Sequence, residues 1–329
     1  MSIDIVIATY NRRAALERCL TALAAQTIGA DRVIVVDDCS PEPAASWLTS
    51  DSFGLPITVI SQTTNGGPAR ARGAGVAASD ADVILFVDDD VVADSHLVER
   101  HIAAHAGGDR LAVIGPLAAP ADWRPTPWNR WEAATLAVEY SRMGRGIYTP
   151  TWRQFFTGNA SVRRRDFLAV GGFDTRFRRA EDIELGIRLA ASGCQFVFEA
   201  TAIGWHYSYR TRRQRLRTAR EYAQADVAID ALYPALRWGR HIDLERSRRH
   251  RLTRAAMRLL RATHSETPFA AAVSTAAPLL GRLPSRSSAP NGALSAAYSA
   301  TYEKALRAAR RDGVSWAGTA RAEVGVLEF

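Results

Sequence analysis

The stretch Val83-Ile84-Leu85-Phe86-Val87-Asp88-Asp89-Asp90 joins five apolar residues to three consecutive acids. The apolar run is bounded by polar residues, which predicts a strand buried on both faces of a sheet. Three adjacent carboxylates repel one another, so a cation, hydrogen bonds or solvent must offset their charge. Two interpretations are open: a solvated loop after a strand, or ligands of a hard divalent cation at the carboxyl edge of a parallel sheet.

Three further apolar runs precede this stretch, at residues 3–8, 32–36 and 57–60. The spacing of Leu16, Cys19, Leu20 and Leu23 predicts a helix after the first run, and a second helix is expected over residues 69–78. Strands that alternate with helices predict an α/β fold with a mostly parallel sheet. Because parallel strands end at one edge, we expect the polar residues after three of them to lie together: Thr9, Asp37 and Asp38, and Asp88–Asp90.

The second part of the chain contains further predicted elements and a second pair of acids. We expect a strand over residues 155–162, a short helix over 165–170, a helix over 180–189 and a strand over 195–198. Glu181 and Asp182 lie in the first turn of the longer helix, where the helix dipole favours carboxylates. Capping of that helix is therefore one interpretation of this acidic pair, and a role in catalysis is the other.

The composition is that of a soluble globular protein, with 329 residues, 47% hydrophobic and 23% charged. The sequence contains no run of 18 apolar residues, so we expect no membrane-spanning helix. The N-terminus lacks the basic and apolar regions of a secretory signal. Cys19, Cys39 and Cys194 lack metal-ligand spacing, as expected for reduced thiols in a cytoplasmic protein.

The net charge of +8 is concentrated in residues 210–261, which hold fifteen Arg and five acidic residues. Helical spacing is found around residues 216–223, 252–260 and 295–311, so an Arg-rich helical extension is expected over 209–329. Three interpretations of the Arg-rich segment are open. The first is a solvated helical surface, or Arg residues that pair with the acidic cleft. The second is a peripheral contact with anionic lipid at the inner face of the membrane or with a phosphorylated acceptor, and the third is nucleic-acid binding. The last is the least favoured, because no nucleic-acid-binding motif accompanies the charge, and we expect no nucleic-acid partner.

Seven motifs in order resemble those of family 2 glycosyltransferases, which are inverting enzymes of the GT-A fold that use nucleotide-sugar donors. The resemblance covers roughly residues 3–208, the predicted catalytic domain 1–208. It rests on the following stretches: Ile7–Asn11, Val36–Asp38, Asn65–Gly73, Phe86–Asp90, Thr157–Asn159, Gly171–Asp174 and Glu181-Asp182. The fold it implies is Rossmann-like, with a mostly parallel central sheet flanked by helices.

The resemblance also implies roles for individual residues. Thr9, Asp38, Gly67, Arg72, Asp88 and Asp89 fall in the donor and nucleotide site, where Gly66-Gly67 could cradle a phosphate. Asp88 and Asp90 are the outer residues of the Asp-x-Asp motif, and Asp90 and His206 are the implied ligands of Mn²⁺ or Mg²⁺. Gly158 and Asn159 shape the sugar and acceptor pocket, and Asp182 is the general base, supported by Glu181. A packed core histidine is the other interpretation of His206.

The implied activity is metal-dependent, inverting transfer of one hexosyl or N-acetylhexosaminyl unit from a nucleotide-diphosphate sugar, expected to be a UDP-sugar, to an acceptor hydroxyl. The Gln-x-x-Arg-Trp motif of processive members is not found after the acidic pair, so a non-processive enzyme is expected. Two alternatives are a nucleotidyltransferase of similar sheet topology and a non-catalytic protein that binds nucleotide sugars. Thr9-Tyr10-Asn11-Arg12 replaces the Gly-rich loop that the first alternative requires.

Overall fold

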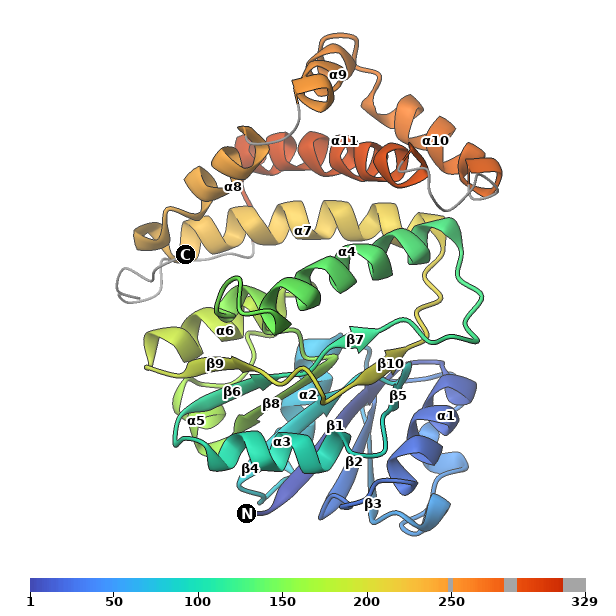
Figure 1. Ribbon diagram of the computed structural model, residues 1–329, viewed down its shortest axis with the longest axis vertical. Coiled ribbons are helices and arrows are strands. Elements are labelled where there is room, and N and C mark those ends of the chain that lie inside the picture. The colour runs from blue at the N-terminus through green and yellow to red at the C-terminus, as the bar shows by residue number, and fades with distance from the viewer. Residues whose placement is uncertain (248–250, 281–288, 316–329) are drawn as a thin grey trace. The chain divides into compact units, whose positions relative to one another are not determined.

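The structure is a computed structural model that describes residues 1–247, 251–280 and 289–315 (Figure 1). The chain divides into two compact units. Unit 1 comprises residues 1–123 and 135–207, and the described part of unit 2 comprises residues 124–134 and 208–315. Since a segment from the middle of the chain belongs to unit 2, the units differ from the predicted domains 1–208 and 209–329, which stay a prediction.

A seven-stranded sheet with the order β3-β2-β1-β4-β8-β6-β9 is the centre of unit 1. All neighbouring strands are parallel except β8, which runs antiparallel to both β4 and β6. The predicted α/β class with a mostly parallel sheet is therefore confirmed. The strands are β1 (Ile3–Thr9), β2 (Arg32–Asp37), β3 (Ile57–Ser61), β4 (Val83–Val87), β6 (Leu111–Ile114), β8 (Asn159–Arg163) and β9 (Gln195–Phe198).

Helices cover both faces of this sheet (Figure 1). On one face, α1 (Arg13–Ala24) and α3 (Leu97–Ala106) share a hydrophobic core with β1, β2 and β4. On the other face, α2 (Pro68–Ala77) packs so closely that a Cβ atom on Gly75 would lie 2.5 Å from Val6 Cγ1. Phe167 of α5 (Arg164–Ala169) packs on that face as well, with its ring centroid 6.0 Å from that of Phe86. Every residue of β4 is consequently buried, as the apolar run predicts.

A small second sheet has the order β5-β10-β7 and lies just beyond the acidic end of β4. It is formed by β5 (Val91–Ala93), β7 (Leu117–Ala118) and β10 (Gly204–His206). In the antiparallel pairing of β10 with β5, His206 lies opposite Val91. The backbone N–H of Tyr207 donates to the carbonyl of Asp90, at 2.9 Å. These pairings bring a segment near residue 205 next to the three acids.

Several elements of unit 1 differ from the predictions. The strand expected over residues 155–162 begins only at Asn159, because η3 (Trp152–Gln154) and a turn precede it. Helix α4 (Pro127–Gly144), α3 and the three short strands of the second sheet carry no prediction. The remaining elements are α6 (Glu181–Ala191), η1 (Ala44–Ser46) and η2 (Ser52–Gly54).

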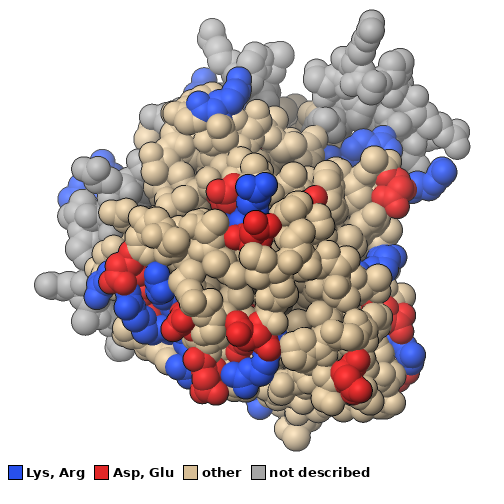
Figure 2. Space-filling model, turned by 60° about the horizontal axis from the view of Figure 1, so that its bottom comes forward, with Lys and Arg blue, Asp and Glu red and all other residues tan. Residues whose placement is uncertain are grey.

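On the face drawn in Figure 2, acidic and basic side chains lie in small mixed groups, so charge on that face is not gathered into one patch.

Unit 2 is helical, as predicted for the C-terminal extension. Its helices are the first turns of α4, then α7 (Arg212–Leu232), η4 (Pro234–Leu236), α8 (Trp238–Ser247), α9 (Arg251–Ala262), α10 (Glu266–Leu280) and α11 (Ala289–Asp312). Trp128, Ala270, Leu294 and Ala297 form its core. Arg215 is buried and ion-paired with Glu132, and Arg246 pairs with Glu303 at 2.9 Å. Part of the Arg-rich segment is thus used in structural ion pairs, while Arg248 and Arg249 lie outside the described residues.

None of the described helices combines the length and the apolar character needed to cross a bilayer.

Candidate functional site

The three acids after β4 have three different environments. The Asp88 side chain is 30% exposed, and its backbone N–H donates to the Gly158 carbonyl at 3.2 Å. Asp89 is buried, and its Oδ2 accepts a hydrogen bond of 2.8 Å from the Thr9 hydroxyl. Asp90 is also buried, and its Oδ1 lies 3.3 Å from His206 Nε2. The solvated-loop interpretation is therefore wrong for Asp89 and Asp90.

Arg12 is the counterion of the two buried acids. Its Nη1 lies 3.0 Å from Asp89 Oδ1 and 3.0 Å from Asp90 Oδ2. Burial raises the pKa of Asp89 to about 6, and the neighbouring Asp90 adds to the rise while Arg12 and Thr9 oppose it. Arg12 follows the first strand in the sequence, and no role was predicted for it. The sequence feature that could have indicated Arg12 is a basic residue shortly after a strand, at a sheet edge where acidic residues follow the neighbouring strands.

Arg72 connects the acids after β4 to those at the start of α6. Its Nη2 donates to Asp88 Oδ1 at 2.6 Å, and its Nη1 donates to Glu181 Oε1 at 2.8 Å. The guanidinium is 7% exposed, and its Nε has no hydrogen-bond partner among the described residues. Arg72 and Glu181 are 109 positions apart in the sequence. The structure thus places Arg72, Asp88 and Glu181 in one site.

The first turn of α6 holds Glu181 and Asp182 in an acidic pair. Ala180, which precedes the helix, has a φ of 60°, a left-handed conformation that is costly for a residue with a Cβ atom. Burial, together with the neighbouring Glu181 carboxylate, raises the pKa of Asp182 to about 7, although Arg72 and the Ile183 N–H act to lower it. A carboxylic acid with a pKa near 7 can both take up and release a proton at neutral pH. This perturbation is typical of a functional residue rather than of a simple helix cap.

Asp38 is committed to the Gly66-Gly67 turn. Its Oδ1 and Oδ2 accept hydrogen bonds from the N–H groups of Gly66 and Gly67, each at 2.8 Å. These N–H groups therefore point to Asp38 and not to a phosphate cradle, which corrects the geometry expected for Gly67. Asp38 also donates its own N–H to the Thr9 carbonyl at 2.9 Å, so this turn is fixed to the end of β1. The nucleotide-binding role of Asp38 and Gly67 stays a prediction.

Gly158 borders the Asp88 carboxylate, whereas the Asn159 side chain is turned into the protein interior. A Cβ atom on Gly158 would lie 3.0 Å from Asp88 Oδ2, so the glycine leaves room for that carboxylate. The Asn159 side chain is buried and donates to the carbonyls of Pro116 and Ala202 at 3.1 and 2.8 Å. Its Oδ1 lies 3.0 Å from His101 Nε2. Asn159 is thus turned into the protein interior, which corrects the expectation that its side chain shapes the acceptor pocket.

The structure therefore brings most of the predicted site residues together, along with Arg12, for which no role was predicted. Hydrogen bonds and ion pairs link two sets: Thr9, Arg12, Asp89, Asp90 and His206, and Asp88, Arg72 and Glu181. The two sets share consecutive residues of one loop, and Asp182 follows Glu181 directly. Among the described residues, no three His, Cys, Asp or Glu side chains are placed to hold a metal ion by themselves.

Comparison with known proteins identifies this arrangement. The family model described as glycosyl transferase family 2 matches residues 4–171, and one described as the N-terminal domain of galactosyltransferase matches residues 142–212. An uncharacterized glycosyltransferase of Haemophilus influenzae is 40% identical over 228 residues, which cover 69% of this chain and 74% of that protein. Validoxylamine A glucosyltransferase of Streptomyces hygroscopicus is 33% identical over 223 residues, 58% of this chain. The chain spans about half (52%) of the length of that relative.

Solved structures show the same fold. The mannosyltransferase PcManGT from Pyrobaculum calidifontis superposes with a TM-score of 0.59 at 17% identity, covering 92% of this chain and 86% of that one. A fragment of S. aureus TarS superposes with a TM-score of 0.52 at 15% identity, covering 95% and 92%. The sheet order and these superpositions thus define the GT-A fold. The chain belongs to glycosyl transferase family 2, which confirms the resemblance.

Proposed function

We propose that the protein transfers one sugar, with inversion, from a nucleotide-diphosphate sugar to an acceptor hydroxyl, with UDP as the expected nucleotide. The observation that carries this proposal is the link through Arg72 between donor-side Asp88 and the Glu181-Asp182 pair. Two proteins of the same fold support a nucleotide donor, since TarS was solved with UDP and PcManGT with GDP-Man and Mn²⁺. Those ligands belong to those proteins, and the choice of UDP for this chain is part of the proposal.

Asp182 is the proposed general base. Inversion requires one in-line displacement at the anomeric carbon, in which the acceptor oxygen loses its proton as it attacks. The raised pKa of Asp182, about 7, matches that task, because an ionised carboxylate of this basicity accepts a proton near neutral pH. The negative charge of Glu181 is offset by Arg72 at 2.8 Å, so in this proposal Glu181 holds Arg72 while Asp182 takes the proton.

Asp90 and His206 are the proposed ligands of a divalent cation. Their facing atoms are 3.3 Å apart, and a carboxylate with an imidazole suits Mn²⁺ or Mg²⁺ when phosphate oxygens complete the shell. When bound, such a cation stabilises the negative charge that develops on the leaving diphosphate. On the protein side, Asp88 is held by Arg72 and spared a clash by Gly158, so it is oriented to contact the donor.

A donor-binding experiment tests the proposal. Thermal stability of the full chain is measured with UDP and GDP, each with and without Mn²⁺. We expect UDP with Mn²⁺ to raise the melting temperature most, since a ligand at a hundredfold excess over its Kd stabilises by about 2.7 kcal/mol. Asp182→Asn is expected to keep this shift and to lose turnover of the UDP-sugar, whereas Asp90→Asn loses the Mn²⁺-dependent part of the shift. No shift with either nucleotide would overturn the proposal.

The stereochemistry is tested separately. The anomeric configuration of the product is read by NMR once an acceptor supports turnover. Inversion is expected, and retention would remove Asp182 from the role of general base in a single displacement.

A further inference from the structure

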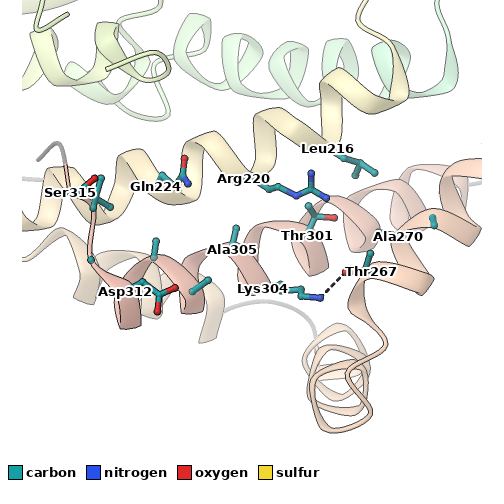
Figure 3. A pocket seen from close by; sticks show the side chains of 15 residues that line it. Leu216, Arg220, Gln224, Thr267, Ala270, Thr301, Lys304, Ala305, Asp312 and Ser315 are labelled. Atoms are coloured by element: carbon teal, nitrogen blue, oxygen red, sulfur yellow. Dashed lines mark hydrogen bonds between the residues drawn. The ribbon is translucent and has the colours of Figure 1, made fainter. Parts of the chain in front are cut away.

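Unit 2 contains an apolar groove that the proposed function does not use. The groove encloses about 730 Å³ between α7, α10 and α11 (Figure 3). Leu216 from α7 and the small side chains Ala270, Ala305 and Ala309 line it. Ligand pockets usually enclose about 300–1,000 Å³ and are mostly apolar, so this groove has the size and the surface of a binding site.

A basic concavity of about 560 Å³ adjoins this groove. Its lining includes six basic side chains from α9, the turn after it and α11: Arg258, Arg261, His264, Lys304, Arg307 and Arg311. Lys304 and Ala308 line both the groove and the concavity, so the two spaces share a wall. An apolar channel therefore continues beside a concentration of positive charge.

Most of this charge is not neutralised by the protein. Glu266, the acidic residue among the described lining residues, is buried and ion-paired with Arg307. Arg311 pairs with Asp312 at 2.8 Å. Arg258 and Arg261 are exposed, and no described carboxylate pairs with either of them. Two guanidinium groups thus face the concavity with their donors available, and guanidinium groups bind phosphate with paired hydrogen bonds.

Lys304 marks the junction of the two spaces. Its Nζ donates to Thr267 Oγ1 at 2.9 Å, which fixes the ammonium at the boundary between the basic concavity and the alanine-lined groove (Figure 3). On the α7 side of the groove, Arg220 and Gln224 add polar donors. A ligand that occupied both spaces would therefore carry an anionic head beside Lys304 and an apolar chain between Leu216 and Ala305.

We propose that unit 2 binds a phosphate-headed lipid, with the phosphate among Arg258, Arg261 and Lys304 and the hydrocarbon chain in the alanine-lined groove. Inorganic phosphate would leave the groove unused, and a neutral lipid would leave the guanidinium groups unpaired. Nucleic acid fits less well, because single strands stack on aromatic side chains and none of the described residues that line the groove is aromatic. This binding is independent of the donor chemistry in unit 1.

Direct binding of defined probes to the full chain tests the proposal. Oleoyl lysophosphatidic acid, oleoyl lysophosphatidylcholine and inorganic phosphate are titrated by calorimetry, the lipids below their micellar concentrations. We expect lysophosphatidic acid to bind about tenfold or more tightly than either of the others, because only it uses both the basic concavity and the groove.

Two sets of variants separate the head and chain contacts. Arg258→Gln with Arg261→Gln should weaken lysophosphatidic acid binding about tenfold or more, whereas Arg213→Gln with Arg240→Gln, an equal loss of charge at exposed sites that line neither space, should not. Ala305→Phe fills the groove and should weaken the lipid but not inorganic phosphate. Melting curves, and the UDP-dependent shift where one is found, verify that each variant is folded.

Three results would overturn the proposal. If inorganic phosphate binds as tightly as lysophosphatidic acid, the basic concavity is a simple anion site and the groove does not contribute to binding. Lysophosphatidylcholine that binds equally would show that the basic side chains have no role. A chain that binds no probe and sediments as a dimer would assign the groove to a second copy of the protein.

Discussion

Arg72 offers the sharpest test of how the site is built. Arg72→Gln removes the cation between Asp88 and Glu181 and leaves the Glu181 carboxylate, 6% exposed, without its partner. Removing one member of a buried ion pair costs about 3–5 kcal/mol, because the remaining charge stays desolvated. A unit of this size loses roughly 2–4 °C in melting temperature per kcal/mol. We therefore expect a decrease of about 6–20 °C.

The measurement is thermal denaturation of the full chain, followed by circular dichroism. Arg165→Gln is the control, since Arg165 and its nearer partner Asp109 are 57% and 78% exposed and an exposed pair contributes about 0–1 kcal/mol. The buried Asp166 is a more distant second partner, with its Oδ1 at 3.8 Å from Arg165 Nε. Adding Glu181→Gln to Arg72→Gln should restore part of the loss, because the stranded charge is then gone. The coupling energy from this double-mutant cycle should be about 0.5–3 kcal/mol.

Two results would refute this reasoning. If Arg72→Gln destabilises no more than Arg165→Gln, the guanidinium does not neutralise buried charge. If Glu181→Gln restores no stability in the Arg72→Gln background, the two side chains are not energetically coupled. The Arg72–Glu181 ion pair then contributes nothing to the free energy of unfolding.

Three further predictions follow from the geometry of the acids. With Asp182 as general base, kcat/KM should fall about tenfold per pH unit below about pH 7. Glu181→Gln should move this acidic limb of the pH profile to lower pH, because a negative charge beside Asp182 is lost. Nucleotide release measured as a function of pH tests both expectations. Because the folded pKa of Asp182 lies above its ordinary value of 3.8, its ionisation destabilises the fold as pH rises from about 4 to about 7, so the melting temperature of Asp182→Asn should gain on the wild type between pH 4 and pH 8. Gly158→Ala should displace the Asp88 carboxylate and reduce turnover about a hundredfold, whereas Gly73→Ala, whose added Cβ meets nothing within 4 Å, should keep turnover and stabilise the helix by about 1 kcal/mol.

The sequence predicts the large elements of unit 1 because each carries its own periodicity. The buried run of β4 and the apolar face of α1 are visible without tertiary information. Helix α3 is hidden because its buried side includes His101 and His105, which a hydropathy pattern counts as polar. In the structure, a ring nitrogen of each histidine lies 2.8 Å from the Ser161 hydroxyl, so both imidazoles are hydrogen-bonded inside the protein. Helix α4 is hidden because its first turns belong to unit 2 and the rest to unit 1, so no single apolar face runs along it.

The site could be predicted at the level of strand ends but not of side-chain directions. Parallel topology alone brings Thr9, Asp38 and Asp88–Asp90 to one edge. The loop backbone decides which of these side chains form hydrogen bonds with the protein itself. Both carboxylate oxygens of Asp38, for example, accept hydrogen bonds from the Gly66-Gly67 turn. The small sheet that brings His206 to Asp90 has strands of two or three residues, too short for any periodic signal.

The repulsion among the three consecutive acids is relieved by the chain itself. Arg72 contacts Asp88, and Arg12 contacts both Asp89 and Asp90, so two guanidinium groups offset part of the negative charge of this loop. A divalent ion that binds Asp90 must then compete with a guanidinium already 3.0 Å from the same carboxylate. Within the proposed function, Arg12 therefore limits the strength of cation binding although it is not one of the predicted ligands, and it lies in the loop after β1, 78 residues before Asp90.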